Sequence, residues 1–339
     1  MRNARRTRSI TAIFGVLALF AASAAVAMAA TVPGTPNNDR LNGSPGDDQI
    51  TALAGNDTVR GFAGNDPIDL GPGCDRALGG RGNDTINGGD NADFIAGGQG
   101  DDAINGDSGR DWLWGQGDND TIKGLAGDDH IWGGDGNDTL IGDTPGVGDL
   151  FSNDRIWGGR GDDNISGGDA RDRLAGGDGN DTIKGDAGND RMSGGSGDDT
   201  QYGGDGNDLI FANVGVDTTY GEAGNDNLWA LARADVTPGP NGETDTVGDT
   251  LDGGPGDDTF HTRDGEVDHI TCGEGNDTAL LDNVDVITDA TAENPKGSCE
   301  TVVRKDVQAK NGKAKGTDRS EDQGQADAQQ GERQHPRPF

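Results

Sequence analysis

Apolar residues recur at every ninth position along most of the chain. From Gly34 to Leu280 the sequence repeats a nine-residue unit with Gly mostly at positions one, two and four and Asp at position six. The unit from Gly79 to Asn87 reads Gly-Gly-Arg-Gly-Asn-Asp-Thr-Ile-Asn. The eighth position is nearly always apolar between polar neighbours, which is the alternation of a short strand with one inward side chain. A fixed internal period of this kind is typical of a solenoid.

The repeat keeps its phase through longer units. Twelve units run without a gap from Gly34 to Ile141, and eight more run from Gly158 to Trp229. Insertions near residues 143–152 and 230–247 are followed by the same unit ending. Because glycine permits positive φ, we expect a turn over the first six residues of each unit and a strand over the last three. Two units would then close one coil, which predicts an all-β fold: a parallel β-roll, or β-helix, with two repeats per coil.

The sixth-position aspartates would repel one another in such a coil. The Asp of one unit lies one strand spacing, about 5 Å, from the Asp of the unit after next. The whole chain has a formal net charge of −34. One buried apolar side chain per unit does not offset the entropy lost when the unit becomes ordered. We therefore predict that the chain stays unfolded without a cation.

A hard divalent cation would resolve this repulsion. Ca²⁺ accepts six to eight oxygen ligands in irregular geometry, whereas Mg²⁺ demands a stricter octahedron and fits less well. Zinc is not favoured, because the four His and three Cys share no ligand spacing. The alternative is that the aspartates only form turns, but turns would accept Asn, Ser or Gly, and the fifth position varies while the sixth does not. The candidate metal ligands are Asp48, Asp57, Asp66, Asp84, Asp93, Asp102, Asp111, Asp120, Asp129, Asp138, Asp163, Asp172, Asp181, Asp190, Asp199, Asp208, Asp226, Asp258 and Asp277.

These repeats resemble a known family. The pattern Gly-Gly-x-Gly-x-Asp-x-apolar-x is similar to the repeats-in-toxin (RTX) family, or haemolysin-type calcium-binding repeats. The resemblance implies several Ca²⁺ ions as cofactors, lying between adjacent coils. Each would be held by turn carbonyls and by a pair of aspartates such as Asp84 with Asp102, or Asp163 with Asp181. It also suggests the hypothesis that calcium outside the cell drives folding.

The two ends of the chain indicate export. Residues 2–8 are rich in Arg, Ile10 to Ala22 is apolar, and Ala27-Met28-Ala29 offers a small-residue cleavage site. Residues 1–29 are therefore predicted to be a signal peptide, which makes the mature protein secreted and extracellular. The alternative is a membrane anchor, but the apolar run is short, and no other segment is long enough to span a bilayer. Residues 304–339 are polar and are predicted to be a disordered tail.

The cysteines agree with an oxidising compartment. Cys272 and Cys299 flank the last repeat and the apolar-rich segment after it. A disulfide between them would stabilise a C-terminal cap over residues 272–303, at the end of a repeat domain spanning residues 30–303. Cys74 is left over, either free or paired between molecules.

Four tryptophans are candidates for a ligand platform. They occupy ninth positions, which the two-unit coil places on one outward face, so we expect an exposed ladder of rings: Trp114, Trp132, Trp157 and Trp229. Stacking of the rings would explain them structurally. A platform for cell-envelope carbohydrate or a partner protein would explain them functionally.

Three classes of function follow from these patterns. The favoured class is a secreted calcium-binding module that folds on calcium binding and serves as an extracellular scaffold or surface component. The second is an adhesin-like protein that binds carbohydrate or a partner through the aromatic ladder. The third is a hydrolase, but no stretch outside the repeats is long enough for a catalytic domain, and the protease-like segment Gly106-Asp107-Ser108-Gly109 is explained by the repeat. We expect no enzyme activity and no nucleic-acid partner.

Overall fold

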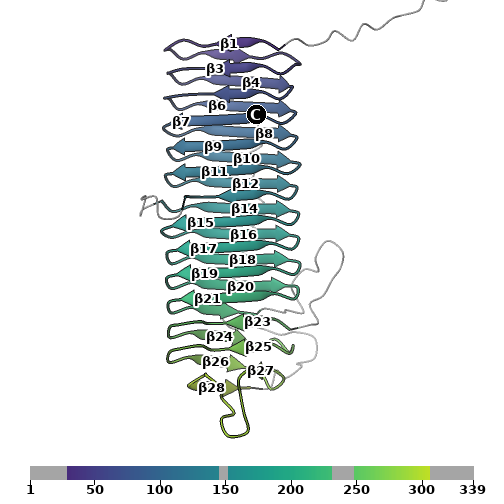
Figure 1. Cartoon of the computed structure of the whole chain (residues 1–339), viewed down its shortest axis with the longest axis vertical. Helices are drawn as coiled ribbons and strands as arrows, with labels where there is room; N and C mark the ends of the chain where they lie inside the picture. The colour runs from purple at the N-terminus through teal and green to yellow at the C-terminus, as the bar shows by residue number, and fades with distance from the viewer. Residues whose placement is uncertain (1–28, 145–151, 231–247, 306–339) are drawn as a thin grey trace, which may run out of the picture.

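The chain forms one long, two-sided solenoid in the computed structural model (Figure 1). The structure describes residues 29–144, 152–230 and 248–305. Nearly all of the predicted signal peptide, most of both insertions and most of the predicted tail lie outside these described residues. Within these three ranges, no helix has the length and apolar character needed to cross a membrane.

Strands alternate along the chain between two parallel sheets of 14 strands each. The odd-numbered sheet contains β1 (Thr31–Pro33), β3 (Gln49–Thr51), β5 (Pro67–Asp69), β7 (Thr85–Asp90), β9 (Ala103–Ser108), β11 (Thr121–Ala126), β13 (Thr139–Ile141), β15 (Asn164–Asp169), β17 (Thr182–Ala187), β19 (Thr200–Asp205), β21 (Thr218–Ala223), β23 (Thr250–Asp252), β25 (His269–Thr271) and β27 (Val286–Ile287). The even-numbered sheet contains β2 (Arg40–Asn42), β4 (Thr58–Ala63), β6 (Arg76–Arg81), β8 (Phe94–Gln99), β10 (Trp112–Gly117), β12 (His130–Asp135), β14 (Arg155–Arg160), β16 (Arg173–Asp178), β18 (Arg191–Ser196), β20 (Leu209–Val214), β22 (Asn227–Trp229), β24 (Thr259–Thr262), β26 (Thr278–Leu281) and β28 (Thr301–Arg304).

The strand register confirms a coil made of two repeats. Strands of one sheet pair with the next strand of the same sheet, and equivalent residues on neighbouring coils are 18 positions apart. The first insertion lengthens its coils to 25 residues, yet His130 pairs with Arg155 in phase. The second lengthens its coils to 32 residues, and Thr218 pairs with Thr250 in phase. The register of the paired strands is therefore the same before and after each insertion.

Sixteen of the 28 described strands have six residues, twice the length that the sequence pattern predicted. Strand β7 continues through the first three positions of the next unit, and Gly89 pairs with Asp107 of β9. Gly89, at a second position, has a φ of 105°, but Gly88, at a first position, does not have a positive φ. For the six-residue strands the prediction of a six-residue turn is thus wrong, because inter-coil pairing continues across the two glycines and leaves the turn to positions four to six.

The core is one column of eighth-position side chains between the two sheets. Most of them, such as Ile86 and Ile104, are fully buried. The column is polar where Gln201 and Thr219 occupy the eighth position, and the Thr219 hydroxyl donates to the Gln201 Oε1 at 3.3 Å. The Gln201 Nε2 is buried without a hydrogen-bond partner. The long N-terminal apolar cluster ends at Ile210, beside this pair, and a second cluster begins at Leu228.

The C-terminal end departs from the nine-residue repeat. Cys272 and Cys299 form a disulfide with their Cα atoms 5.2 Å apart. Strand β28 pairs with β26 and ends the even-numbered sheet. The Arg304 guanidinium donates to the carbonyl oxygen of Asp282 at 2.9 Å, which holds the last strand against the preceding turn. Cys74 is exposed and forms no disulfide.

Candidate metal centres along the solenoid edges

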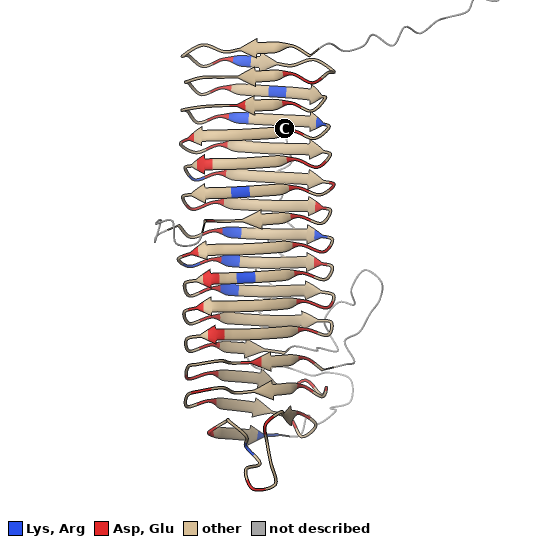
Figure 2. Ribbon diagram, viewed as in Figure 1, with Lys and Arg blue, Asp and Glu red and all other residues tan. Residues whose placement is uncertain are grey.

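Sixth-position aspartates line both edges of the solenoid. Figure 2 shows the acidic residues gathered in the turns, at the ends of the strands. Every predicted ligand residue is buried, with no more than 2% of its surface exposed. Burying so many carboxylates is strongly unfavourable unless each is neutralised or paired.

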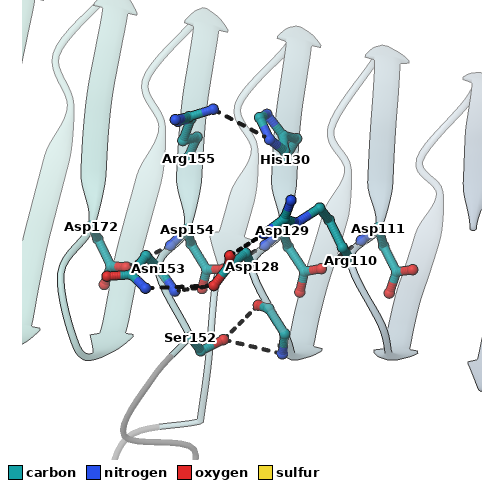
Figure 3. Close-up of polar contacts among 11 residues, drawn as sticks. Arg110, Asp111, Asp128, Asp129, His130, Ser152, Asn153, Asp154, Arg155 and Asp172 are labelled. Carbon is teal, nitrogen blue, oxygen red and sulfur yellow. Dashed lines mark hydrogen bonds and ion pairs between the residues drawn. The ribbon is translucent and has the colours of Figure 1, made fainter. Parts of the chain in front are cut away.

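One carboxylate oxygen of each aspartate is used within the fold. The Oδ1 of Asp120 accepts a hydrogen bond from the backbone N–H of Asp102 at 2.8 Å. The same contact crosses the first insertion, where the N–H of Asp129 donates to the Oδ1 of Asp154 at 2.8 Å (Figure 3). Each side chain therefore hydrogen-bonds the backbone of the preceding coil, and the carboxylates lie in a row along the edge.

The second carboxylate oxygen has no partner. The Oδ2 of Asp138 is buried without a hydrogen bond and lies over the first-position Gly133 of its own unit. A Cβ added to Gly133 would lie 2.2 Å from this oxygen and 2.6 Å from the carbonyl oxygen of Gly158 on the next coil. Two hydrogen-bond acceptors, this Oδ2 and the Gly158 carbonyl oxygen, thus lie close to the same point, and no hydrogen-bond donor of the described residues lies there. Such an arrangement is favourable only when a cation or a proton is bound. The same unpartnered Oδ2 occurs at Asp57, Asp66, Asp84, Asp93, Asp102, Asp111, Asp120, Asp129, Asp163, Asp172, Asp181, Asp190, Asp199, Asp208, Asp226, Asp258 and Asp277.

Asp48 is the predicted ligand residue that differs. It lies near the N-terminal end of the solenoid, and its Oδ2 accepts a hydrogen bond from the backbone N–H of Ser44. Although burial opposes ionisation, the hydrogen bonds from Ser44 and Ala30 hold the pKa of Asp48 below its ordinary value. Asp48 is therefore satisfied by the protein itself.

Burial raises the pKa of the interior aspartates. The pKa values of Asp129 and Asp172 rise to about 9, first through loss of solvation and further through the charge of Asp154. The pKa of Asp120 rises to about 8 by burial, with Asp138 adding to the effect. Hydrogen bonds from backbone N–H groups act in the opposite direction but are outweighed. Without metal, Asp120, Asp129 and Asp172 would therefore hold protons at neutral pH, and a cation would displace them.

The donor set fits a hard cation such as Ca²⁺. The edges offer only oxygen atoms, in carboxylates about one strand spacing apart and in stacked turn carbonyls. A Cβ on Gly82, for example, would lie 2.3 Å from the carbonyl oxygen of Gly64 on the preceding coil. Among the described residues, no group of three or more His, Cys, Asp or Glu is arranged to hold a metal. A ligand set here must therefore combine a pair of carboxylates with backbone carbonyls.

The structure adds aspartates that the sequence analysis left out. They occupy sixth positions of irregular units and are also buried: Asp75, Asp154, Asp217, Asp249 and Asp268. The Oδ1 of Asp75 accepts a hydrogen bond from the N–H of Asp57 at 2.6 Å, as in the regular units. The phase of the repeat was the signal that could have identified them.

Fifth-position side chains form a second set of contacts between coils. The Oδ1 of Asn119 accepts from the backbone N–H of Asn137 at 2.8 Å, and the N–H of Asn119 donates to the Oδ1 of Asp101 at 3.0 Å. These bonds run in the opposite direction to those of the sixth-position aspartates. The residue at this position varies, but where it is Asn or Asp it supplies a bond between coils that needs no metal. Where the position holds Arg110, the side chain instead forms an ion pair with Asp128 (Figure 3).

The predicted tryptophan ladder lies on the even-numbered sheet. Ring centroids are 5.1 Å apart between Trp114 and Trp132, and 5.0 Å apart between Trp132 and Trp157, with nearly parallel planes. Trp229 lies farther along the sheet and stacks on His261. The expectation of exposure is wrong for Trp132 and Trp229, which are only 7% and 9% exposed. Rings one strand spacing apart cover each other's faces.

A second column of rings lies beside the ladder at seventh positions. Phe94 stacks on Trp112 with centroids 5.8 Å apart, and Trp112 stacks on His130 at 4.5 Å. Burial, reinforced by the charges of Arg155 and Arg110, lowers the pKa of His130 to about 4. His130 therefore behaves as a neutral ring in this column.

Comparison with known proteins agrees with the geometry of the edges. The sequence model of the RTX calcium-binding nonapeptide repeat matches residues 33–68, 69–104, 78–113, 114–144, 151–174, 166–201, 202–229 and 245–279. These matches cover more than half of the chain and describe a calcium-binding repeat. No curated protein matches the chain.

Proposed function

The chain belongs to the RTX calcium-binding nonapeptide repeat family, and on that basis we propose a secreted protein whose β-roll folds when calcium binds. Its repeats bind several Ca²⁺ ions. The observation that supports coupling to folding is the row of buried carboxylates whose Oδ2 atoms have no partner. Such a row is unstable when ionised and unneutralised, so the folded state requires either a cation or bound protons at these carboxylates.

The predicted aspartates are the proposed ligands. On one edge an ion would lie between Asp120 and Asp138, and on the other edge between Asp111 and Asp129, each completed by turn carbonyls. The bound ion supplies positive charge that replaces the protons and offsets the repulsion between coils. The Oδ1 atoms keep their hydrogen bonds to the backbone and thereby hold the carboxylates in place.

The proposed setting is extracellular. Residues 1–29 have the pattern of a secretory signal, and the Cys272–Cys299 disulfide suits an oxidising compartment. Calcium outside the cell is abundant enough to fill weak sites that stay empty in the cytosol. We propose a non-catalytic role as an extracellular scaffold or surface component, since the matched family describes a repeat and not a catalytic domain.

Calcium titration followed by far-ultraviolet circular dichroism tests this proposal. Residues 30–339 would be titrated first with calcium and, in a parallel sample, with magnesium. We expect a cooperative rise in β signal at about 10⁻⁴ to 10⁻³ M calcium, with no comparable rise in magnesium. A full β signal in chelator that calcium leaves unchanged would refute the metal sites and leave the aspartates as turn formers.

A further inference from the structure

The outer face of the even-numbered sheet differs in charge from the rest of the protein. From β2 to β26 its seventh- and ninth-position side chains include no Asp or Glu, although the chain as a whole has a formal net charge of −34. Figure 2 shows red acidic residues in the turns and blue basic residues mainly on the strands. This face is therefore the part of the described surface that is suited to an anion.

Three arginines lie in register on this face. Arg155, Arg173 and Arg191 occupy the seventh positions of β14, β16 and β18 and pair directly across the sheet. Like charges on neighbouring strands, about 4.8 Å apart, destabilise a sheet. Arg155 and Arg173 are exposed, and neither forms an ion pair within the described part of the chain. An anionic ligand would relieve this repulsion.

The tryptophan ladder ends beside these arginines. Trp157 stacks on Trp132 on one side, whereas on its other side the paired positions hold Ala175 and then Ser193. Neither small side chain can cover an indole face. The next ring at this position is Phe211 of β20, and the guanidinium of Arg191 lies over it with its Cζ 4.9 Å from the ring centroid. One face of Trp157 is thus left without a stacked ring, next to exposed guanidinium groups.

We infer that this surface, formed by Trp157, Ala175, Ser193 and the three arginines, binds an acidic polysaccharide. A uronate ring has an apolar face that stacks on an indole and a carboxylate that a guanidinium binds with two hydrogen bonds. Each uronate ring carries one carboxylate, and the length of a pyranose ring is comparable to the spacing of the strands. Successive carboxylates can therefore lie near successive arginines of the column. The inference rests on the proposed calcium-folded β-roll, because only the folded sheet brings these strands together.

A nucleic acid fits this surface less well. The face is narrow, and both of its edges carry the acidic turns, which repel a wide polyanion. A chain of single sugar rings can follow the column of arginines across the strands without reaching the turns. A neutral sugar would use the Trp157 face but leave Arg173 unneutralised. The acidic glycan is therefore the ligand that uses both parts of the surface.

Isothermal titration calorimetry on the calcium-loaded full chain tests this inference. The probe is a galacturonate trisaccharide, and its methyl ester is the neutral control of the same shape. The test variant is Arg173→Gln, and the matched control is Arg160→Gln, an exposed arginine of β14 that pairs with Asp135 outside this surface. We expect the acid to bind, the ester to bind at least tenfold more weakly, and R173Q, unlike R160Q, to lower affinity about tenfold, the loss expected for one charge-assisted contact.

Several outcomes would overturn the inference. Equal binding of the acid and its ester would remove the role of the arginines, and equal affinities of R173Q and R160Q would place the site elsewhere. Binding of single-stranded DNA with the same affinity and the same sensitivity to R173Q would show a general anion surface instead of a glycan site. Circular dichroism in calcium separates the two proposals, because a well-folded chain that binds no trisaccharide refutes only this one.

Discussion

The backbone N–H of Asp120 donates a hydrogen bond to the Oδ1 of Asp138 at 2.7 Å, while the Oδ2 of Asp138 is buried without a partner. The two oxygens of one side chain therefore have different roles. Oδ1 joins neighbouring coils directly, whereas Oδ2 lies close to Gly133, as does the carbonyl oxygen of Gly158, and needs a cation or a proton. Substitutions at adjacent positions of one turn can separate the metal-dependent role of the sixth position from the metal-independent hydrogen bond of the fifth.

Asp120→Asn removes charge but keeps an oxygen that can accept the hydrogen bond from Asp102. We expect a stability deficit that grows with calcium concentration, because the wild type gains free energy from every site that fills and the variant loses sites. The measurement is urea unfolding at a series of calcium concentrations. A deficit that is constant across the series would show that Asp120 is not a ligand.

Asn119→Ala is the matched change at the fifth position. It removes the acceptor for the N–H of Asn137 and touches no proposed ligand. The expected deficit is about 1 kcal/mol, the typical net value of one hydrogen bond, and it should be the same at every calcium concentration. If this deficit instead rose with calcium, the fifth-position bonds would be part of the metal sites.

The raised pKa values predict opposite effects of pH with and without calcium. Without metal, Asp129 and Asp172 have pKa values of about 9 in the folded state, against 3.8 for a free aspartate. Between these values the folded state binds protons that the unfolded state has released, so metal-free stability is greatest at the acidic end and falls as pH rises. In chelator, the β signal should therefore be stronger near about pH 5 than near about pH 8.

Calcium should reverse this dependence. Bound carboxylates are ionised, so acid competes with the metal and lowers its apparent affinity. Calcium titrations at the same two pH values, followed by circular dichroism, measure this shift. A calcium midpoint that does not change with pH, or a β signal in chelator that is stronger in alkali, would show that the buried aspartates do not hold protons in the metal-free fold.

The sequence alone predicted the architecture because one inward side chain per unit determines both the period and the buried side. Ile86 and Ile104 show this, since each recurs at the eighth position and faces its equivalent on the next coil. The role of Gly88 was not predictable in the same way. Its Cβ would meet the Oδ2 of Asp93 and the carbonyl of Gly106, a crowding that exists only once the coils are stacked. Glycine in sequence indicates a turn more readily than it indicates a close approach.

Gly133→Ala tests this crowding. Gly133 does not have a positive φ, so alanine would cause strain only through its Cβ, which would lie 2.2 Å from the Oδ2 of Asp138. Overpacking of this kind typically costs about 1–3 kcal/mol, and here it also displaces a proposed ligand. We expect lower stability in urea and a higher calcium midpoint.

Gly117→Ala is the control for that substitution. Gly117 also lacks a positive φ, and its added Cβ would come no closer than 3.9 Å to a neighbouring atom, the carbonyl oxygen of Gly98. Alanine there should be neutral or stabilise the protein by about 0.4–1 kcal/mol, by restricting the unfolded chain. Equal losses for both variants would mean that the first-position glycine is required for a reason other than its contact with the aspartate.

The polar pair in the core predicts a stabilising change. Gln201 and Thr219 are paired at inward positions where the other neighbouring units have apolar side chains, and the Gln201 Nε2 is buried without a hydrogen bond. An unsatisfied buried donor costs about 1–3 kcal/mol.

The double variant Gln201→Leu with Thr219→Val removes both polar groups together, so neither is left without its partner, and it joins the two apolar clusters. We expect its urea midpoint in saturating calcium to rise. Gln201→Leu alone should gain less, because the Thr219 hydroxyl then loses its acceptor. A lower midpoint for the double variant would show that this part of the core depends on the polar pair for its packing.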